Sequence, residues 1–383
     1  MLFNEGHSIN VAKDRCLNIL YVDMKCSYCL DHCPANAISY NANGLDLNSD
    51  LCEGCGLCFQ DCPTEVFTSG LWDETAIIYD IQKSGWSIIE LFCGKHPAPF
   101  KKDSSQDRGA IQIPACLSAI SRGAWYELGL NNKLELHLEK CETCSMKDTV
   151  SRIQFNISTA SEWLYASGYT ADISFITSDA TGMTRRKFKA IESAVKVTSR
   201  RDFFLTFSKT IKSKAELISK KEQYSFKRNM NSLLPRWHTR LAETYLKDVR
   251  GKNETLHLAY WPIIKIKDNC SGCGMCIIVC PTKTLSITME GETFARSFTS
   301  GLCIDCRLCQ TFCPKKAIIR SREQIKTPFT PITLAIGSVN ECNCCGKTIY
   351  NRMDNLCYWC KEEDKAEKNA MEHYRKLFLK TEE

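Results

Sequence analysis

The segment CEGCGLCFQDCP, residues 52–63, decides how this chain folds. Its four cysteines follow the spacing C-x2-C-x2-C-x3-C-P, and the same spacing returns in residues 270–281 and 303–314. A fourth run, CSYCLDHCP at residues 26–34, has one cysteine fewer. Three cysteines at steps of three wrap one face of a cubane cluster, and the fourth points toward a neighbouring cluster. The spacing therefore predicts four [4Fe–4S] clusters held in pairs by an internal repeat, and a protein that moves electrons one at a time.

The pairing of the runs assigns the ligands of each cluster. A first module is expected at residues 1–70 and a second at residues 262–322. Glycines such as Gly54 and Gly272 permit positive φ angles, which let backbone N–H groups reach the cluster sulfurs. The expected ligand sets are Cys270, Cys273, Cys276 with Cys313; Cys303, Cys306, Cys309 with Cys280; Cys52, Cys55, Cys58 with Cys33; and Cys26, Cys29 with Cys62.

The last of these sets lacks a fourth ligand. The regular position is Asp23, whose carboxylate would give a labile corner or a three-iron cluster, and Cys16 is the other candidate. Over residues 16–66 and 265–320 the chain resembles bacterial multi-domain 4Fe–4S ferredoxins of the dicluster group. Some members of that group begin C-x9-C-x2-C-x3-C-P, the spacing found from Cys16 to Pro34. The resemblance favours Cys16 and leaves Asp23, or a vacant corner, as the alternative.

Residues 75–178 are expected to form a small α/β domain. Apolar runs at residues 86–92, 111–115, 134–138 and 173–176 are typical of buried parallel strands, and helical patterns cover residues 117–130 and 150–167. Four cysteines follow three of these strands, at one edge of the sheet where sites of α/β proteins form. The domain resembles small cysteine-rich electron-input subunits of some hydrogenases and heterodisulfide reductases, which implies a fifth iron–sulfur centre. Zinc, or buried thiols without a metal, are the alternatives for the four residues Cys93, Cys116, Cys141 and Cys144.

A C-terminal segment at residues 338–383 is expected to contain a zinc ribbon followed by a charged helix. Two C-x2-C knuckles give tetrahedral thiolate ligation, and Gly346 permits the tight turn of the first knuckle. Residues 342–360 are too few to bury a core without such a staple. The expected zinc ligands are Cys342, Cys345, Cys357 and Cys360, with Cys344 left over.

The net charge of +6 is distributed unevenly. Residues 14–66 carry eight acids against two basic residues, whereas residues 185–252 carry nineteen Lys and Arg against six acids. The basic stretch lies in a helical segment expected at residues 179–260, with a break at Pro235. We expect either a linker whose apolar faces pack against the modules or a dock for an acidic redox partner, where opposite charge speeds encounter. A nucleic-acid surface is a less favoured interpretation.

The remaining sequence argues against several classes of protein. Residues 1–15 lack the apolar core of a signal peptide, and no run is long enough to span a membrane. Many thiols in a chain without a secretory signal indicate metal ligation in a reducing cytoplasm and not disulfides. We find no dinucleotide-binding fingerprint, no Walker loop and no nucleophile–base pair, so the chain is not expected to be an enzyme by itself. The fold class is therefore expected to be α+β, with two dicluster modules flanking the α/β domain and the basic segment.

These observations predict a cytoplasmic polyferredoxin, which passes single electrons from a low-potential donor to a redox enzyme partner. A reductase acting at the cysteines of the α/β domain, or a nucleic-acid-associated iron–sulfur and zinc protein, are the alternatives. Residues 265–320 carry eight basic residues against four acids. Because positive charge raises a cluster's potential and negative charge lowers it, electrons are expected to enter at the first module and leave through the second.

Overall fold

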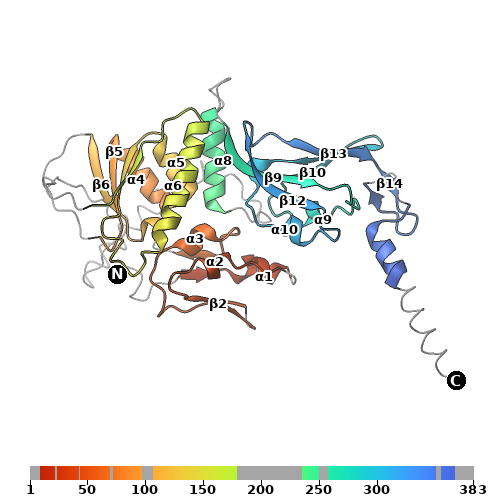
Figure 1. Ribbon diagram of the computed structural model, residues 1–383, viewed down its shortest axis with the longest axis horizontal. Helices are drawn as coiled ribbons and strands as arrows, with labels where there is room; N and C mark the ends of the chain where they lie inside the picture. Colours follow the sequence, from red (N-terminus) through yellow and green to blue (C-terminus); the bar gives the residue numbers. More distant parts are fainter. Residues whose placement is uncertain are drawn as a thin grey trace, which may run out of the picture. The chain divides into compact units, whose positions relative to one another are not determined.

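A computed structural model divides the chain into two compact units, Met1–Ala259 and Tyr260–Glu383. It describes residues 9–21, 24–42, 44–69, 72–96, 107–178, 235–249, 258–350 and 355–366. Helices and strands are mixed throughout, so the fold is α+β (Figure 1). No helix in these ranges is both long and apolar enough to cross a bilayer.

The first module consists of two antiparallel strand pairs joined by short helices. Strand β1 (Ile9–Val11) pairs with β4 (Phe67–Ser69), and β2 (Ile38–Asn41) pairs with β3 (Gly44–Leu47). Buried Leu45 and Phe67 form its core together with Cys16 and Cys62, so cysteines take the place of core side chains. The short helices are η1 (Lys13–Arg15), α1 (Leu17–Leu20), α2 (Tyr28–Asp31) and α3 (Leu57–Asp61).

The second part of this unit is the α/β domain. Its four strands lie in the order β6-β5-β7-β8 and are all parallel, as expected for apolar runs separated by helical patterns. The helices lie beside this sheet, with α5 packed against α4, α6 and α8 (Figure 1). The elements are α4 (Glu74–Ser84), β5 (Ile88–Phe92), β6 (Arg108–Gln112), η2 (Leu117–Ala119), α5 (Arg122–Gly129), β7 (Lys133–His137), α6 (Thr149–Ala166) and β8 (Ile173–Ile176).

Several boundaries differ from the sequence-based expectation, most clearly those of β6 and α5. Strand β6 ends at Gln112, three residues before the expected end at Ala115. The helix expected over residues 117–130 is wrong in its first turn, because α5 begins only after Ser121, whose Oγ accepts a hydrogen bond from the Ala124 N–H (3.0 Å). The residues before α5 form a separate 3-10 turn, η2, which begins directly after Cys116.

Helix α8 (Arg236–Val249) follows Pro235 and is the described part of the basic segment. Its side chains Trp237, Leu241 and Tyr245 are buried. The carbonyl oxygen of Trp237 comes so close to Gly123 that a Cβ there would lie 2.3 Å from it. This helix therefore packs tightly on α5 of its own chain; residues 185–234 and 250–252 of the segment lie outside the described residues.

The second unit repeats the first module and extends it. Its hairpin β10–β11 pairs Leu285 with Phe298, as β2–β3 pairs Ile38 with Leu47, and a further strand, β13, joins β11. Strands β9 and β12 form the second pair, and β14 pairs with β15 near the C-terminus. The elements are β9 (Ala259–Ile266), α9 (Met275–Ile278), β10 (Leu285–Glu290), β11 (Thr293–Phe298), η3 (Ser300–Leu302), α10 (Leu308–Thr311), β12 (Ile318–Ile325), β13 (Ile332–Ser338), β14 (Asn340–Glu341) and β15 (Thr348–Ile349).

Candidate metal centres

The first group of thiols in the N-terminal module includes Cys16. Burial raises the pKa of Cys29 to about 12, and the charges of Cys62, Cys26 and Cys16 act in the same direction. These thiols are therefore electrostatic neighbours. The structure brings Cys16 to the three cysteines that lacked a fourth partner, whereas Asp23 lies outside the described residues.

The side chain of Asn18 connects Cys16 to this group. Its Nδ2 donates to the carbonyl oxygen of Cys26 (2.8 Å), and its Oδ1 accepts from the N–H of Cys26 (2.7 Å). Cys16 is the N-cap of the short helix α1, which carries Asn18 in its first turn. The amide thus holds the helix against the Cys26 loop, a contact that our sequence reasoning missed.

The second group of the first module consists of Cys33, Cys52, Cys55 and Cys58. Burial raises the pKa of Cys58 well above its usual range, and the charges of Cys55, Cys52 and Cys33 add to the effect. Cys29 of the first group also contributes, so the two groups are neighbours. Gly54 and Gly56 have φ angles of 68° and 78°, which places the backbone of this loop in the left-handed region as expected.

The same crossing of runs occurs in the second module. Burial raises the pKa of Cys276 to about 11, and the neighbouring charges include Cys313 from the other run. The pKa of Cys309 is likewise raised, first by burial and then by neighbours that include Cys280. In three groups, then, the last cysteine of one run lies beside the first three of another, and in the remaining group Cys62 lies beside Cys26, Cys29 and Cys16.

A common turn follows all four runs. The third residue after each final cysteine has a φ angle of 48° or 53°, a left-handed conformation that non-glycine residues rarely adopt. The turn directs the next backbone N–H back to the sulfur, as in the bonds from Ala37 to Cys33 (3.3 Å) and from Ala317 to Cys313 (3.1 Å). Such donors stabilise a thiolate or a cluster. The turn residues are Asn36, Glu65, Lys283 and Lys316.

The four cysteines of the α/β domain line one cavity of about 60 Å³. They follow the carboxyl ends of β5, β6 and β7, where parallel strands place the sites of α/β folds. Burial raises the pKa of Cys141 to about 12, with further contributions from Cys116, Cys93 and Cys144. The cavity is several times larger than the roughly 10–15 Å³ needed for one water molecule.

The spacing of the thiols separates two kinds of site. Four sulfurs about 2.3 Å from one zinc ion lie about 3.8 Å from one another, whereas a cluster spreads its ligands over several irons. Among the described residues, only one group of three or more His, Cys, Asp or Glu side chains has its ligand atoms within 4.8 Å of one another. That group is Cys342, Cys345, Cys357 and Cys360, which among the described residues is the one already spaced for a single ion.

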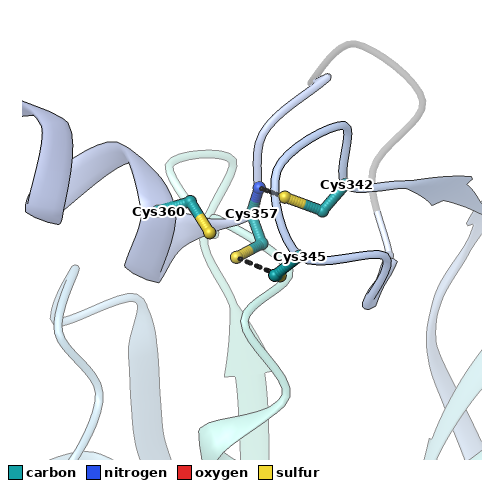
Figure 2. Close-up of side chains that lie close together, drawn as sticks. All are labelled: Cys342, Cys345, Cys357 and Cys360. Atoms are coloured by element: carbon teal, nitrogen blue, oxygen red, sulfur yellow. Dashed lines mark hydrogen bonds between the residues drawn. The ribbon is translucent and has the colours of Figure 1, made fainter.

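The single-ion group lies at the β14–β15 hairpin. Figure 2 shows its four thiols pointing toward one another, with Cys345 and Cys357 sulfurs 3.7 Å apart. The N–H of Cys357 donates to the sulfur of Cys342 (3.2 Å) and is the main reason that the pKa of Cys342 falls to about 6. Gly346, with a φ angle of 68°, forms the knuckle turn, while Cys344 is exposed and outside the group.

The cluster loop of the first module touches the α/β site. The Oγ of Ser118 donates to the carbonyl oxygen of Cys55 (2.8 Å), and a Cβ on Gly56 would lie only 2.4 Å from that of Ala119. Burial followed by the charge of Cys116 raises the pKa of Cys55 to about 12. Two candidate centres are therefore neighbours across this contact.

An ion pair joins the same two loops. Lys95 Nζ lies 2.7 Å from Glu53 Oε2 and 3.0 Å from Ser145 Oγ. Glu53 follows Cys52, Lys95 lies two residues after Cys93, and Ser145 follows Cys144. The pair thus connects one cluster loop of the first module to two cysteine loops of the α/β site. Sequence reasoning could not find it, because the partners are 42 residues apart.

A buried network of charged side chains adjoins the cysteine site of the α/β domain. His137 is 2% exposed and forms ion pairs with Glu90 (3.3 Å) and Glu139 (3.0 Å). Arg108 lies 2.8 Å from Glu90 and 2.7 Å from Glu135. Burial alone would raise the pKa of Glu90, but the bonds from His137 and Arg108 outweigh it and lower the value to about 2. His137 also lines the cavity of the four cysteines, so the network reaches this site through His137.

The described arginines of the basic segment are engaged within the chain. Arg236 lies 2.7 Å from Glu65, and Arg240 lies 2.5 Å from Glu127 and 3.5 Å from Glu74. These two positive charges therefore hold α8 against the rest of the first unit. The apolar face of α8 is buried, as the linker interpretation expects, and the rest of the predicted docking segment lies outside the described residues.

Comparison with known proteins identifies the two modules. The 4Fe-4S dicluster domain family matches residues 24–66 and 269–317. The chain is 38% identical over 69 residues to a ferredoxin-type protein NapF of Haemophilus influenzae, covering 16% of this chain and 37% of that protein. It is 34% identical over 53 residues to the delta subunit of an NADH-dependent phenylglyoxylate dehydrogenase of Aromatoleum evansii, covering 14% and 50%.

A third relative is matched over most of its length. This is a ferredoxin of Rickettsia felis, 31% identical over 102 residues, which cover 25% of this chain and 85% of the ferredoxin. The chain spans half or less of the first two relatives, so these describe its modules and not its whole length. On the strength of the crossed cysteine runs, the two family matches and this relative, the chain belongs to the 4Fe–4S dicluster ferredoxins.

Proposed function

We propose that this chain is a polyferredoxin that passes single electrons between a low-potential donor and a redox enzyme partner. The crossing of the cysteine runs carries the proposal, because it gives each module two neighbouring sets of four thiols, the arrangement that two cubane clusters need. A [4Fe–4S] cluster, when bound, accepts and releases one electron at a time. The chain itself holds the irons, surrounds them with apolar side chains and donates backbone N–H groups to the sulfurs.

The incomplete set of the first module is completed by Cys16 in this proposal. Cys16 lies among Cys26, Cys29 and Cys62, and the Asn18 amide fixes the helix that carries it. Burial raises the pKa values of Cys26, Cys29 and Cys62, so these three thiols are protonated in the absence of metal. Binding of iron must therefore release protons, which makes assembly of the clusters easier at higher pH.

We further infer that the α/β domain holds a fifth iron–sulfur centre. Cys93, Cys116, Cys141 and Cys144 line a cavity, yet no three of them come within 4.8 Å of one another, which is too open for one zinc ion. The hydrogen bond from Ser118 to Cys55 supports a position of this proposed centre next to the first module. Electrons would then pass directly between the first module and the α/β domain.

The site at Cys342, Cys345, Cys357 and Cys360 is proposed to bind zinc with a structural role. Four thiolates converging within 4.8 Å suit tetrahedral zinc, and four protein ligands leave no open position for a substrate. Among the residues that the structure describes, the surrounding core consists of these cysteines, Ile349 and Leu356. Such a small core needs the ion to remain folded.

The partner is proposed to be an oxidoreductase complex in the cytoplasm. One relative is named as a subunit of a dehydrogenase, which supports the same kind of assembly for this chain. The opposite charge of residues 14–66 and 265–320 supports entry of electrons at the first module and exit through the second. A partner that docks on the basic stretch 185–252 would have to use residues other than Arg236 and Arg240, which are paired within the chain.

Metal analysis of the full chain tests this function. After purification without oxygen, we expect about sixteen irons from four cubanes, with about two to four more for the α/β site. We also expect about one zinc. Reduction with a low-potential reductant should produce the EPR signals of several clusters. A chain that contains only zinc, or whose iron cannot be reduced, would contradict the proposal. Cys344→Ser is the matched control, since this thiol is exposed and outside every group.

A further inference from the structure

A buried arginine occupies the cluster side of the second module. In β11 the side chains of Phe294, Arg296 and Phe298 alternate with more exposed residues, and Phe298 belongs to the core. Arg296 is 2% exposed. Strand alternation calls for an apolar residue at this position, because side chains two apart on a strand lie on the same face. The arginine therefore needs a specific partner to be stable there.

The protein supplies only part of that partner. Arg296 Nη1 donates to the sulfur of Cys270 (3.3 Å). Its Nε and Nη2 make no hydrogen bond to any residue that the structure describes. Across the same residues, no carboxylate forms an ion pair with it, although the Phe294 ring lies 5.8 Å from the guanidinium carbon. A buried charge without a counter-charge is unfavourable, so the guanidinium group needs an anionic partner at this position.

The charge of Arg296 reaches a second cysteine of the same set. Burial raises the pKa of Cys276 to about 11, and Arg296 acts in the opposite direction. Cys270 and Cys276 belong to one ligand set, whose remaining members are Cys273 and Cys313. The unpaired N–H groups are therefore next to the space that the cluster of this set would fill, and a thiolate-bound iron–sulfur cluster is an anion.

The first module differs at the equivalent position. Phe298 pairs with Leu285, which lies five residues after Cys280; Leu47 pairs with Ile38, which lies five residues after Cys33. Arg296 lies two residues before Phe298, and Leu45 lies two residues before Leu47. Leu45 is 1% exposed, so both positions are buried, but only the second module has a charge there.

We propose that Arg296 tunes the cluster held by Cys270, Cys273, Cys276 and Cys313, by donating hydrogen bonds and positive charge to its sulfurs. This rests on the proposed electron-transfer function. Uptake of one electron adds one negative charge to the cluster and breaks no bond. A fixed positive charge in a poorly solvated site stabilises the reduced form more than the oxidised form, which raises the reduction potential. Leu45 cannot do so, and the second module thereby becomes the electron acceptor of the first.

Charge removal from the full chain tests the proposal. We compare Arg296→Gln with Arg322→Gln, which removes an equal charge from an exposed residue of the same unit. In an EPR-monitored redox titration, Arg296→Gln should make one cluster at least tenfold harder to reduce, equal to a 59 mV shift to lower potential. Arg322→Gln should shift no cluster potential by as much as 59 mV. Equal potentials in both variants, at unchanged iron content, would overturn the proposal.

A second measurement remains decisive if Arg296→Gln fails to bind its cluster. The wild-type chain is labelled with ¹⁵N-arginine, and pulsed EPR of the reduced clusters detects arginine nitrogens close to the unpaired electron. We expect a coupling that disappears in Arg296→Lys, which keeps the charge. An identical coupling in both chains, or none in wild type, would overturn the inference. Wild-type chain without reducible iron would instead overturn the proposed function, so the two failures are distinguishable.

Discussion

Ser118, which lies two residues after Cys116 of the α/β site, donates a hydrogen bond to the carbonyl oxygen of Cys55. The hydrogen bond is 2.8 Å long, and it is flanked by the close approach of Gly56 to Ala119. A ligand loop of one centre therefore rests directly on a ligand loop of another. Such contact is what short-range electron exchange requires, and it depends on the absence of a side chain at residue 56.

Gly56→Ala should disturb this contact. The new Cβ would lie 2.4 Å from Ala119, at a φ of 78° that non-glycine residues rarely adopt. We expect a lower thermal midpoint and a weaker magnetic interaction between the two reduced centres in EPR. The backbone conformation alone costs about 1–2 kcal/mol, and the steric clash adds to this.

Gly85→Ala separates the effect of backbone conformation from the effect of the steric clash. Gly85 has a φ of 71° at the end of α4, and nothing lies within 4 Å of a Cβ placed there. This variant should therefore lose only the stability that the unfavourable backbone conformation costs, and the magnetic interaction between the centres should stay unchanged. Equal interactions in Gly56→Ala and wild type would show that the contact does not link the centres.

Cys16→Ser should remove one cluster of the first module or convert it to a three-iron form. Cys16 lies beside Cys26, Cys29 and Cys62, and serine oxygen is a poorer iron ligand than thiolate. We expect a loss of about one to four irons per chain, together with the EPR signal of a three-iron cluster in the first case.

Asn18→Ala should have a smaller effect in the same direction. It breaks two hydrogen bonds, of 2.8 and 2.7 Å, that hold α1 on the Cys26 loop. At roughly 1 kcal/mol per bond, the cluster should become more labile to chelators without being absent. If Cys16→Ser keeps full iron and Asp23→Ala loses it, the carboxylate is the fourth ligand instead.

The grouping of the cysteine runs and the parallel sheet could be predicted, because each depends on a short sequence pattern that recurs along the chain. Apolar runs indicate buried parallel strands, and Cys93, Cys116, Cys141 and Cys144 then fall at the same edge. The Asn18 contact and the Glu53–Lys95 pair could not be predicted, since they depend on how distant loops meet. Arg296 had a detectable signal, because it alternates with Phe294 and Phe298, but alternation alone does not say which face is buried.

Cys357→Ser should release the ion of the C-terminal site. The four thiols lie within 4.8 Å of one another, and three cannot hold zinc as strongly as four. We expect zinc to fall from about one per chain to near zero, with faster proteolysis after residue 338, while iron stays constant. Cys344→Ser should keep the zinc, because that thiol is exposed. Retention of zinc by Cys357→Ser would exclude this ligand set.

Stability should decline as pH rises through the pKa of His137. Its pKa is raised because the bonds and charges of Glu90 and Glu139 outweigh burial, which alone would lower it. A raised pKa means that the stabilisation is fully present below the usual value of about 6.5 and disappears above the folded-state value. Glu90, with its pKa lowered to about 2, stays ionised throughout this range and loses its contribution only in acid.

Glu90→Gln is the variant that tests this network. It removes one carboxylate from His137, while Glu139 remains 3.0 Å away. We expect a loss of about 1–3 kcal/mol below neutral pH and a smaller loss at higher pH, where wild-type His137 is itself neutral. Glu135→Gln is the control, since Glu135 pairs with Arg108 at 2.7 Å and its loss should lower the thermal midpoint by a similar amount at every pH between about 6 and 9. The measurement is the thermal midpoint of the full chain across that range. A pH dependence that is the same in both variants would mean that His137 is not the titrating group.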